Sequence, residues 1–330
     1  MTDIDSNGFN ICWKRMFHHR GVFVKRYISF LLAIGICISV SVVAEGNPLS
    51  IDSCYRNEVG DDGRGVLYFN KNDFFDNVED DVVLSIPNQI NGCPVFAIGD
   101  RAFLWAEYIT SITIPEGVEI IGESAFANIN SLVEMQLPES LRIIKDFAFA
   151  GNEDLVDIKL GSNISYIGES VFASCHSLEQ IVIPSSVTHI GVNPFYECLN
   201  LKSIEVDNSN TLFSSIDNML ISNHDKRLIS YAIGCCEKIV DLPHDLIIIG
   251  ESSFRQSSVL RVILHDSVKT IENEAFTGCN DLVYMNIPES VTSIGERAFE
   301  GCVNIHLGVK KGSFADEYAN LQGIPCVAIP

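Results

Sequence analysis

Four cysteines are the side chains whose type and spacing come closest to a recognisable chemistry, that of disulfide bridging. Cys175, Cys198, Cys279 and Cys302 each lie three residues after a phenylalanine. If that position repeats, Cys175 with Cys198 and Cys279 with Cys302 lie on neighbouring coils, near enough for a bridge but with poor disulfide torsion. We therefore expect the four thiols to form an inward, apolar ladder.

The other cysteines give weaker signals. Cys54 and Cys93 would join an N-terminal cap to the first coil if the compartment is oxidising. The adjacent pair Cys235-Cys236 lacks the two-residue spacer of a redox or zinc motif, and nothing in the sequence explains it.

Carboxylates recur as well, at the second position after an isoleucine that comes five residues before a phenylalanine. These are Glu123, Glu169, Glu251 and Glu296. Catalysis by two carboxylates needs two different environments, whereas a repeat gives every copy the same one. We interpret these glutamates as a turn feature.

No other pattern predicts catalysis or a bound cofactor. The chain has no Gly-x-Ser-x-Gly elbow, no phosphate-binding glycine loop and no paired histidines at helical metal-ligand spacing. The acidic runs Asp61-Asp62 and Glu79-Asp80-Asp81 lack calcium-loop spacing, so we interpret them as solvated turns. The sequence predicts no enzyme, no cofactor and no metal site. We expect four histidines at coil corners and strand ends to be exposed: His176, His189, His244 and His265.

The elements that position these side chains follow from a repeat. Eight phenylalanines stand 23 residues apart, except for one step of 22 and one of 59: Phe103, Phe126, Phe149, Phe172, Phe195, Phe254, Phe276 and Phe299. A fixed period of this length is typical of stacked coils. We expect the eight rings to form one continuous ladder, because a single unit cannot bury its own apolar face.

Each unit contains one strand signal and two corners. After Phe126, for example, Leu132 opens a run in which Met135 and Leu137 alternate with Glu134 and Gln136, which predicts a short strand with one buried face. A glycine follows the isoleucine in all but two units, where Lys145 and Glu272 replace it. Glycine suits a corner where a side chain would crowd a neighbouring coil, and the two exceptions indicate that a left-handed backbone is not required there.

The run Ile121-Gly122-Glu123-Ser124-Ala125-Phe126, followed by Leu132, Ile-x-Ile/Leu-Pro and Glu-Ser-Val/Leu, resembles the BspA-type leucine-rich repeat family. The resemblance covers roughly residues 83 to 325. It implies a leucine-rich repeat solenoid of period about 23, with short parallel strands on one face and irregular or short helical or 3-10 segments on the other. Members are typically surface or secreted proteins of bacteria and some protists, implicated in adhesion.

We divide the chain into a signal peptide or signal anchor (1–44), an N-terminal cap (45–82), the solenoid (83–311) and a C-terminal cap (312–330). Basic residues precede an apolar stretch that ends at Val42-Val43-Ala44, which is typical of a cleaved leader. Its length also approaches that of a membrane anchor. The step of 59 leaves 36 extra residues, since 59 less 23 is 36. We interpret 207–239 as an irregular insertion, either a hairpin or an irregular coil, within one solenoid.

Charge narrows the range of partners. Beyond residue 44 the chain has 17 Lys and Arg (22 less 5) and 41 Asp and Glu (43 less 2), a net charge of about −24. Nucleic acid and anionic membrane surfaces are therefore poor partners. Membrane contact is expected only through the N-terminal segment if it stays uncleaved.

A partner would meet the outward residues of the strands. One outward row contains Thr113, Gln136, Lys159, Val182, Glu205, Ile263 and Asn286, and a second contains Ser111, Glu134, Asp157, Gln180, Ser203, Arg261 and Tyr284. The strongest indications of a binding surface are Val182, Ile263 and Tyr284, because apolar and aromatic side chains anchor interfaces. The candidate binding face is Gln136, Lys159, Val182, Glu205, Arg261, Ile263, Tyr284 and Asn286.

Two functional hypotheses remain. The chain is a secreted or surface-displayed protein that binds extracellular protein or glycan through this face, or it is a structural spacer or surface-layer component with no discrete ligand.

Overall fold

The computed structural model describes residues 42–44, 47–49, 55–60, 63–69, 82–90, 92–107 and 109–330. Most of the predicted leader, Cys54 and both acidic runs lie outside these residues, so those predictions stay untested. In the described part of the chain, no helix has the length and apolarity needed to cross a membrane.

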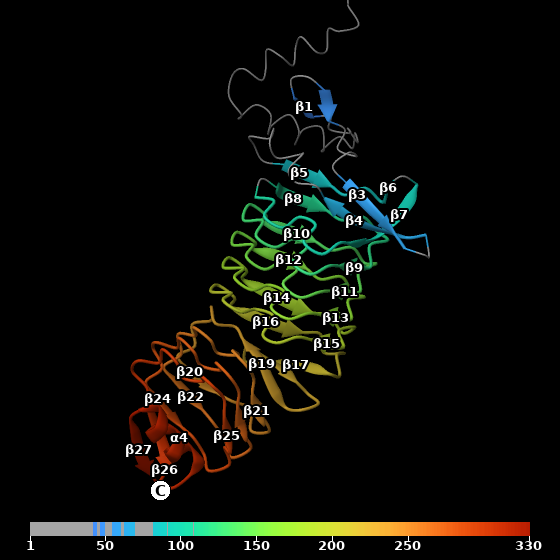
Figure 1. Ribbon diagram of the computed structural model, residues 1–330. Helices are drawn as coiled ribbons and strands as arrows, with labels where there is room; N and C mark the ends of the chain where they lie inside the picture. The colour runs from blue at the N-terminus through green and yellow to red at the C-terminus, as the bar shows by residue number, and fades with distance from the viewer. Residues whose placement is uncertain are drawn as a thin grey trace, which may run out of the picture.

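The chain winds into a solenoid whose coils each contribute strands to two parallel sheets (Figure 1). The first sheet carries the strands that the sequence predicted. Its strands are β5 (Val82–Ser85), β8 (Ile109–Thr113), β10 (Glu134–Gln136), β12 (Asp157–Lys159), β14 (Gln180–Ile183), β16 (Ser203–Val206), β20 (Ile239–Asp241), β22 (Arg261–Ile263), β24 (Tyr284–Asn286), β26 (His306–Lys310) and β27 (Cys326–Ile329). Within it the strands pair in four groups: β5 with β8, β10 with β12, β14 with β16, and β20 through β22, β24 and β26 to β27. We call the outward side of these strands the strand face.

The second sheet lies after the next corner of each coil and consists mostly of two-residue strands. They are β7 (Cys93–Ile98), β9 (Ile120–Ile121), β11 (Ile143–Ile144), β13 (Tyr166–Ile167), β15 (His189–Ile190), β19 (Arg227–Tyr231), β21 (Ile248–Ile249), β23 (Thr270–Ile271) and β25 (Ser293–Ile294). Ile143 pairs with Tyr166, one repeat along, so like positions lie over like. The predicted solenoid is confirmed, and this second ladder is an addition to it.

The third side of each coil is a turn segment that carries the phenylalanine. Its backbone also pairs from coil to coil: Phe126 N–H donates to Ala148 O at 2.8 Å, and Phe149 N–H donates to Val171 O at 2.9 Å. These bonds satisfy backbone groups that a buried turn would otherwise leave unpaired.

Caps close both ends. At the N-terminal end the hairpin of β3 (Tyr55–Val59) and β4 (Gly65–Phe69) pairs with β7, and β6 (Gln89–Ile90) folds back on β7. At the C-terminal end helix α4 (Phe314–Gln322) begins after Ser313, whose side chain accepts from Asp316 N–H, and ends at Gly323 in the left-handed conformation. This helix lies in the segment that the sequence set apart as a cap.

The phenylalanines are buried and stacked, but in two ladders instead of one. Ring centroids lie 5.2 Å apart between Phe103 and Phe126, and 5.8 Å apart between Phe172 and Phe195. The second ladder begins at Tyr231, whose ring lies 4.9 Å from that of Phe254. Among the described rings no contact joins Phe195 to Tyr231, so the expectation of one continuous ladder is wrong.

The break explains the irregular step of 59. Tyr231 lies 23 residues before Phe254 and takes the place of a phenylalanine. The 36 residues by which this step exceeds the period therefore contain a complete coil of 23 and only 13 extra residues, so 207–239 is not an insertion throughout. The extra residues form a hairpin of β17 (Phe213–Ile216) and β18 (Met219–Ser222), which pairs with β19.

Strand β18 separates two hydrophobic cores. Leu220 packs in the N-terminal core, whereas Met219 and Ile221 pack in the C-terminal core. All three are buried, because successive side chains of a strand point to opposite faces and here both faces are covered. Both parallel sheets are interrupted at this level, and Figure 1 shows the direction of the solenoid changing here. We call this level the bend.

The corner glycines behave as predicted. Gly191 has no left-handed φ, yet a Cβ there would lie 2.5 Å from Glu169 N and 2.6 Å from Gly168 C on the preceding coil. Close packing of coils, and not backbone conformation, requires glycine at this position. A left-handed residue lies two positions after each ladder phenylalanine and, except at Phe195, also two positions before it, as at Ser170 and Ser174.

We expect Gly191→Ala to lower the free energy of unfolding by about 1–3 kcal/mol, because the added methyl group displaces backbone. Lys145→Ala is the matched control, since residue 145 occupies the same repeat position and already carries a Cβ; it should change stability by less than about 0.5 kcal/mol. Urea unfolding measures both. Equal stability of the two variants would contradict the crowding explanation.

The repeated cysteines are buried as predicted, but their thiols also form polar contacts. Cys175 Sγ lies 3.2 Å from Phe149 O, and Cys198 Sγ lies 3.1 Å from Phe172 O, each thiol donating to a carbonyl of the preceding coil. Asn152, at the same repeat position, donates to Phe126 O in the same way. Burial raises the pKa of Cys175 to about 12. Both observations describe structural thiols, and the description of an apolar ladder was incomplete.

Candidate functional site

The first outward row of side chains is exposed on the strand face. Gln136 pairs with Lys159 across β10 and β12, and Val182 pairs with Glu205 across β14 and β16. Every member of this row is exposed, from Thr113 to Asn286. Val182 keeps 52% of its surface exposed and Ile263 keeps 38%, so two apolar side chains face solvent in the middle of a sheet.

The second outward row is more enclosed than expected. Ser111, Asp157, Ser203 and Tyr284 are only partly exposed. The Tyr284 hydroxyl donates to Asn286 Oδ1 at 2.5 Å, and the guanidinium of Arg261 lies 5.6 Å from the Tyr284 ring centroid. Arg261, Tyr284 and Asn286 thus form one contact group at the C-terminal end of the face, which the sequence had only placed in two rows.

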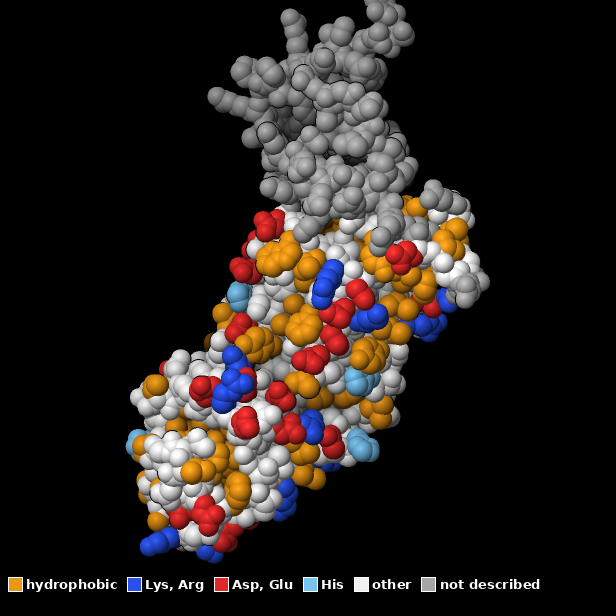
Figure 2. All heavy atoms as spheres, in the orientation of Figure 1, with side chains coloured by type: hydrophobic (Ala, Val, Ile, Leu, Met, Phe, Trp, Pro, Cys, Tyr) orange, Lys and Arg blue, Asp and Glu red, His pale blue; other side chains and the backbone are white. Residues whose placement is uncertain are grey.

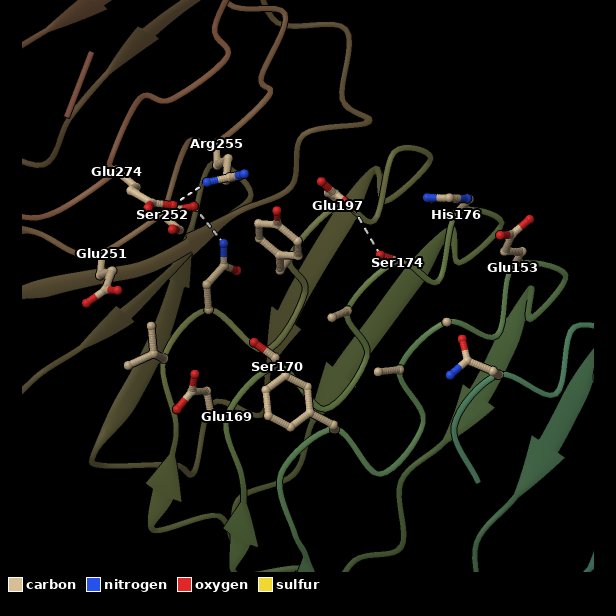
Figure 3. Close-up of a pocket in the computed structure, with 18 of the residues that line it drawn as sticks. Glu153, Glu169, Ser170, Ser174, His176, Glu197, Glu251, Ser252, Arg255 and Glu274 are labelled. Carbon is tan, nitrogen blue, oxygen red and sulfur yellow. Dashed lines mark hydrogen bonds and ion pairs between the residues drawn. The ribbon is translucent and has the colours of Figure 1, made fainter. Parts of the chain in front are cut away.

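A concave region lies at the bend, on the side of the coils that carries the turn segments. It is an open groove with a volume of about 640 Å³. We call it the bend cleft. In Figure 3, Glu251, Ser252, Arg255 and Glu274 come from the C-terminal half, and Glu169, Ser170, Ser174 and Glu197 come from the N-terminal half.

Polar contacts join the two halves beneath the cleft. The buried Asn193 donates from Nδ2 to Ser252 O at 2.6 Å and accepts from Ser230 Oγ at 2.7 Å. Near the rim, Gln256 Nε2 donates to Glu197 Oε1 at 3.0 Å. These bonds hold the walls in a defined position although both parallel sheets stop here.

The arginines of the cleft are already occupied. Arg255 pairs with Glu274, and its guanidinium lies 4.9 Å from the ring centroid of Tyr196. Arg297 also pairs with Glu274, at 2.5 Å. Both arginines therefore share one carboxylate, and neither pairs with another glutamate that lines the cleft.

A sequence profile of the BspA type leucine rich repeat region, in six copies, matches residues 97–226 and 213–311. The chain belongs to this family. The matches span the strand face, the bend and both aromatic ladders.

Two solved structures resemble the BspA-type fold of this chain. One is the pneumococcal vaccine antigen PcpA, with a TM-score of 0.64 at 19% identity over 77% of this chain and 79% of that one. The other is a leucine-rich repeat protein from Eubacterium ventriosum, with a TM-score of 0.54 at 20% identity over 79% of this chain and 72% of that one. At these identities the likeness shows the fold alone. No curated protein matches the chain.

The BspA-type repeat does not give every recurrent glutamate the same surroundings, contrary to our expectation. Glu169 and Glu251 both line the bend cleft, whereas Glu123 and Glu296 do not. The pKa of Glu251 is raised, first by burial and then by the negative charges of Glu272, Glu274 and Glu169. The bend creates this difference, and the only signal in the sequence was the irregular step between Phe195 and Phe254.

We expect Glu251→Gln to raise Tm slightly at neutral pH, on the order of 1 °C, because it removes a charge that its neighbours repel. A carboxyl whose pKa is raised in the folded state favours folding when protonated, so its charged form weakens the fold above that pKa. The difference should disappear well below the ordinary pKa of 4.5, where the carboxyl is protonated in both states. Glu296→Gln, at the same repeat position, is the control. A Tm that falls at neutral pH would contradict the expected repulsion.

The histidines differ in part from the prediction. His189 and His244 are exposed, but His176 and His265 are partly buried. His265 stacks on His244, with ring centroids 3.7 Å apart, and its Nε2 lies 2.7 Å from Asp241 Oδ1. These two contacts enclose the His265 ring, which single-residue exposure arguments overlook. Within the described ranges, no three His, Cys, Asp or Glu side chains gather closely enough to hold a metal ion.

Proposed function

We propose that this chain is a secreted or cell-surface binding protein that engages an extracellular protein or glycan through its strand face. The observation that carries the proposal is the row of exposed side chains over buried strand positions, which runs along the strand face on both sides of the bend. The scaffold fixes this row in a regular register, while Gln136, Lys159, Val182 and Glu205 differ freely in chemistry.

The family supports the cellular setting of this proposal. The BspA-type resemblance implies surface or secreted proteins, and PcpA is described as a vaccine antigen. Asp and Glu side chains are distributed over the coloured part of the surface seen in Figure 2, from the first coils to the C-terminal end. A partner with a neutral or basic surface suits such a protein better than an anionic one.

Charge reversal on the strand face tests the proposal. Lys159→Glu with Arg261→Glu should reduce adhesion of protein-coated beads to host cells or matrix by at least about tenfold. The reason is that charges on the two sides of an interface must be opposite, and the substitutions reverse two of them. The matched control is Arg142→Glu with Lys269→Glu, which makes the same charge change beside strands of the second sheet. Both residues are exposed.

The structural-spacer hypothesis makes the opposite prediction. A spacer has no discrete ligand, so adhesion would be equally weak, or equally unaffected, in both double variants. Equal adhesion of the two would therefore reject the strand-face proposal.

A further inference from the structure

The bend cleft is a groove that the proposed strand face does not use. Its lining runs from Asn128 to Arg297 and takes residues from seven ladder coils, those of Phe126, Phe149, Phe172, Phe195, Phe254, Phe276 and Phe299. A groove that crosses this many coils is elongated along the solenoid. Its 640 Å³ is within the range of sites that hold a ligand, and its length fits an extended chain segment better than a compact small molecule.

The negative charge of the groove favours a cationic ligand. Its lining includes Glu153, Glu169, Glu197, Glu251 and Glu274 against only Arg255 and Arg297, and His176 is the one further titratable cation. Because both arginines pair with Glu274, the other four carboxylates dominate the field. An anionic ligand would be repelled, whereas a cation would be attracted.

Glu169 and Glu251 are the carboxylates best placed for such a cation. They come from opposite halves of the solenoid, and the charge of Glu169 contributes to the raised pKa of Glu251. Neither side chain has a hydrogen-bond or ion-pair partner among the described residues. Two unpaired carboxylates that repel each other across a groove are complementary to a group that presents donors in two directions.

The walls favour a planar cation over a spherical one. Phe147 is 40% exposed and lines the groove with Tyr196, whose ring already accepts the guanidinium of Arg255. A guanidinium stacks on aromatic faces and donates to carboxylates on both sides, which an ammonium does less well.

We propose that the bend cleft binds an arginine side chain of an extended segment from a partner protein, with Glu169 and Glu251 as the carboxylates that accept its guanidinium. The site is distinct from the strand face, so either assignment can fail without the other.

The test uses the full chain and a fluorescently labelled ten-residue peptide with two arginines in a Gly-Ser background. Fluorescence anisotropy should show a Kd at least about tenfold higher for the double variant Glu169→Gln with Glu251→Gln, because two charge-assisted hydrogen-bonding groups are removed. The matched control, Glu123→Gln with Glu296→Gln, makes the same change at the same repeat positions outside the groove, so it corrects for the attraction of any cation to an acidic protein. Its Kd should change less than about twofold.

Three results would overturn the proposal. Equal loss of binding in both double variants would show general charge attraction only. Equal binding of a peptide with glutamine in place of arginine would show that the guanidinium is not the group recognised. Equal affinity for spermidine would assign the groove to small amines instead of a protein segment. Circular dichroism of both variants checks that each is folded. A higher Tm of the free Glu251→Gln protein together with weaker peptide binding would support a site for a ligand.

Discussion

Phe149→Ala should lower the free energy of unfolding by about 3–5 kcal/mol, since it removes a fully buried ring and leaves a cavity. The Phe149 ring stacks on Phe126 at 5.6 Å and on Phe172 at 5.7 Å. The substitution therefore weakens contacts with both neighbouring coils. Because each coil of a solenoid touches only its neighbours, we expect the N-terminal ladder to unfold first.

Phe147→Ala is the control for this experiment. Phe147 lies two residues away, has the same side chain and is 40% exposed at a left-handed position. Its replacement should change stability by less than about 0.5 kcal/mol. Denaturant unfolding followed by circular dichroism measures both variants, and similar losses would contradict the ladder as the source of stability.

Leu220→Ala should have the second-largest effect, a loss of about 2–5 kcal/mol. Leu220 is fully buried in strand β18, between Met219 and Ile221, which face the other core. Shortening it opens a cavity in the N-terminal core at the point where that core ends. Hydrogen exchange of the Phe195 coil, measured by mass spectrometry, should therefore increase most.

The matched control is Ile216→Ala in the same hairpin, because Ile216 pairs with Met219 but is 44% exposed. We expect a change of less than about 0.5 kcal/mol. If Leu220→Ala cost as little as Ile216→Ala, the hairpin would act only as a surface feature, and the separation of the two cores would need another explanation.

The regular part of this fold could be predicted because it repeats. A single phenylalanine is ambiguous, but eight at one spacing determine which positions are buried, and the buried state of Met135 and Leu137 follows from strand alternation alone. The position of Tyr231 in the ladder is also predictable from the sequence, since it lies one period before Phe254. A pattern restricted to phenylalanine leaves this tyrosine out.

The bend could not be predicted, because it arises from contacts between residues that no period relates. Asn193 and Ser252 are 59 residues apart and meet only after β17 and β18 fold between the two cores. The difference between Glu251 and Glu296, which occupy one repeat position, depends on that meeting. A repeat predicts equal environments, so its exceptions appear only in three dimensions.

An experimental structure of the chain tests the central claim most directly. We predict that the rings of Phe195 and Tyr231 lie on opposite sides of strand β18, with Phe103 to Phe195 in one stack, Tyr231 to Phe299 in another and an open cleft between Glu169 and Glu251. One unbroken stack running from Phe195 into Phe254, with 207–239 looped out and the cleft closed, would contradict the account.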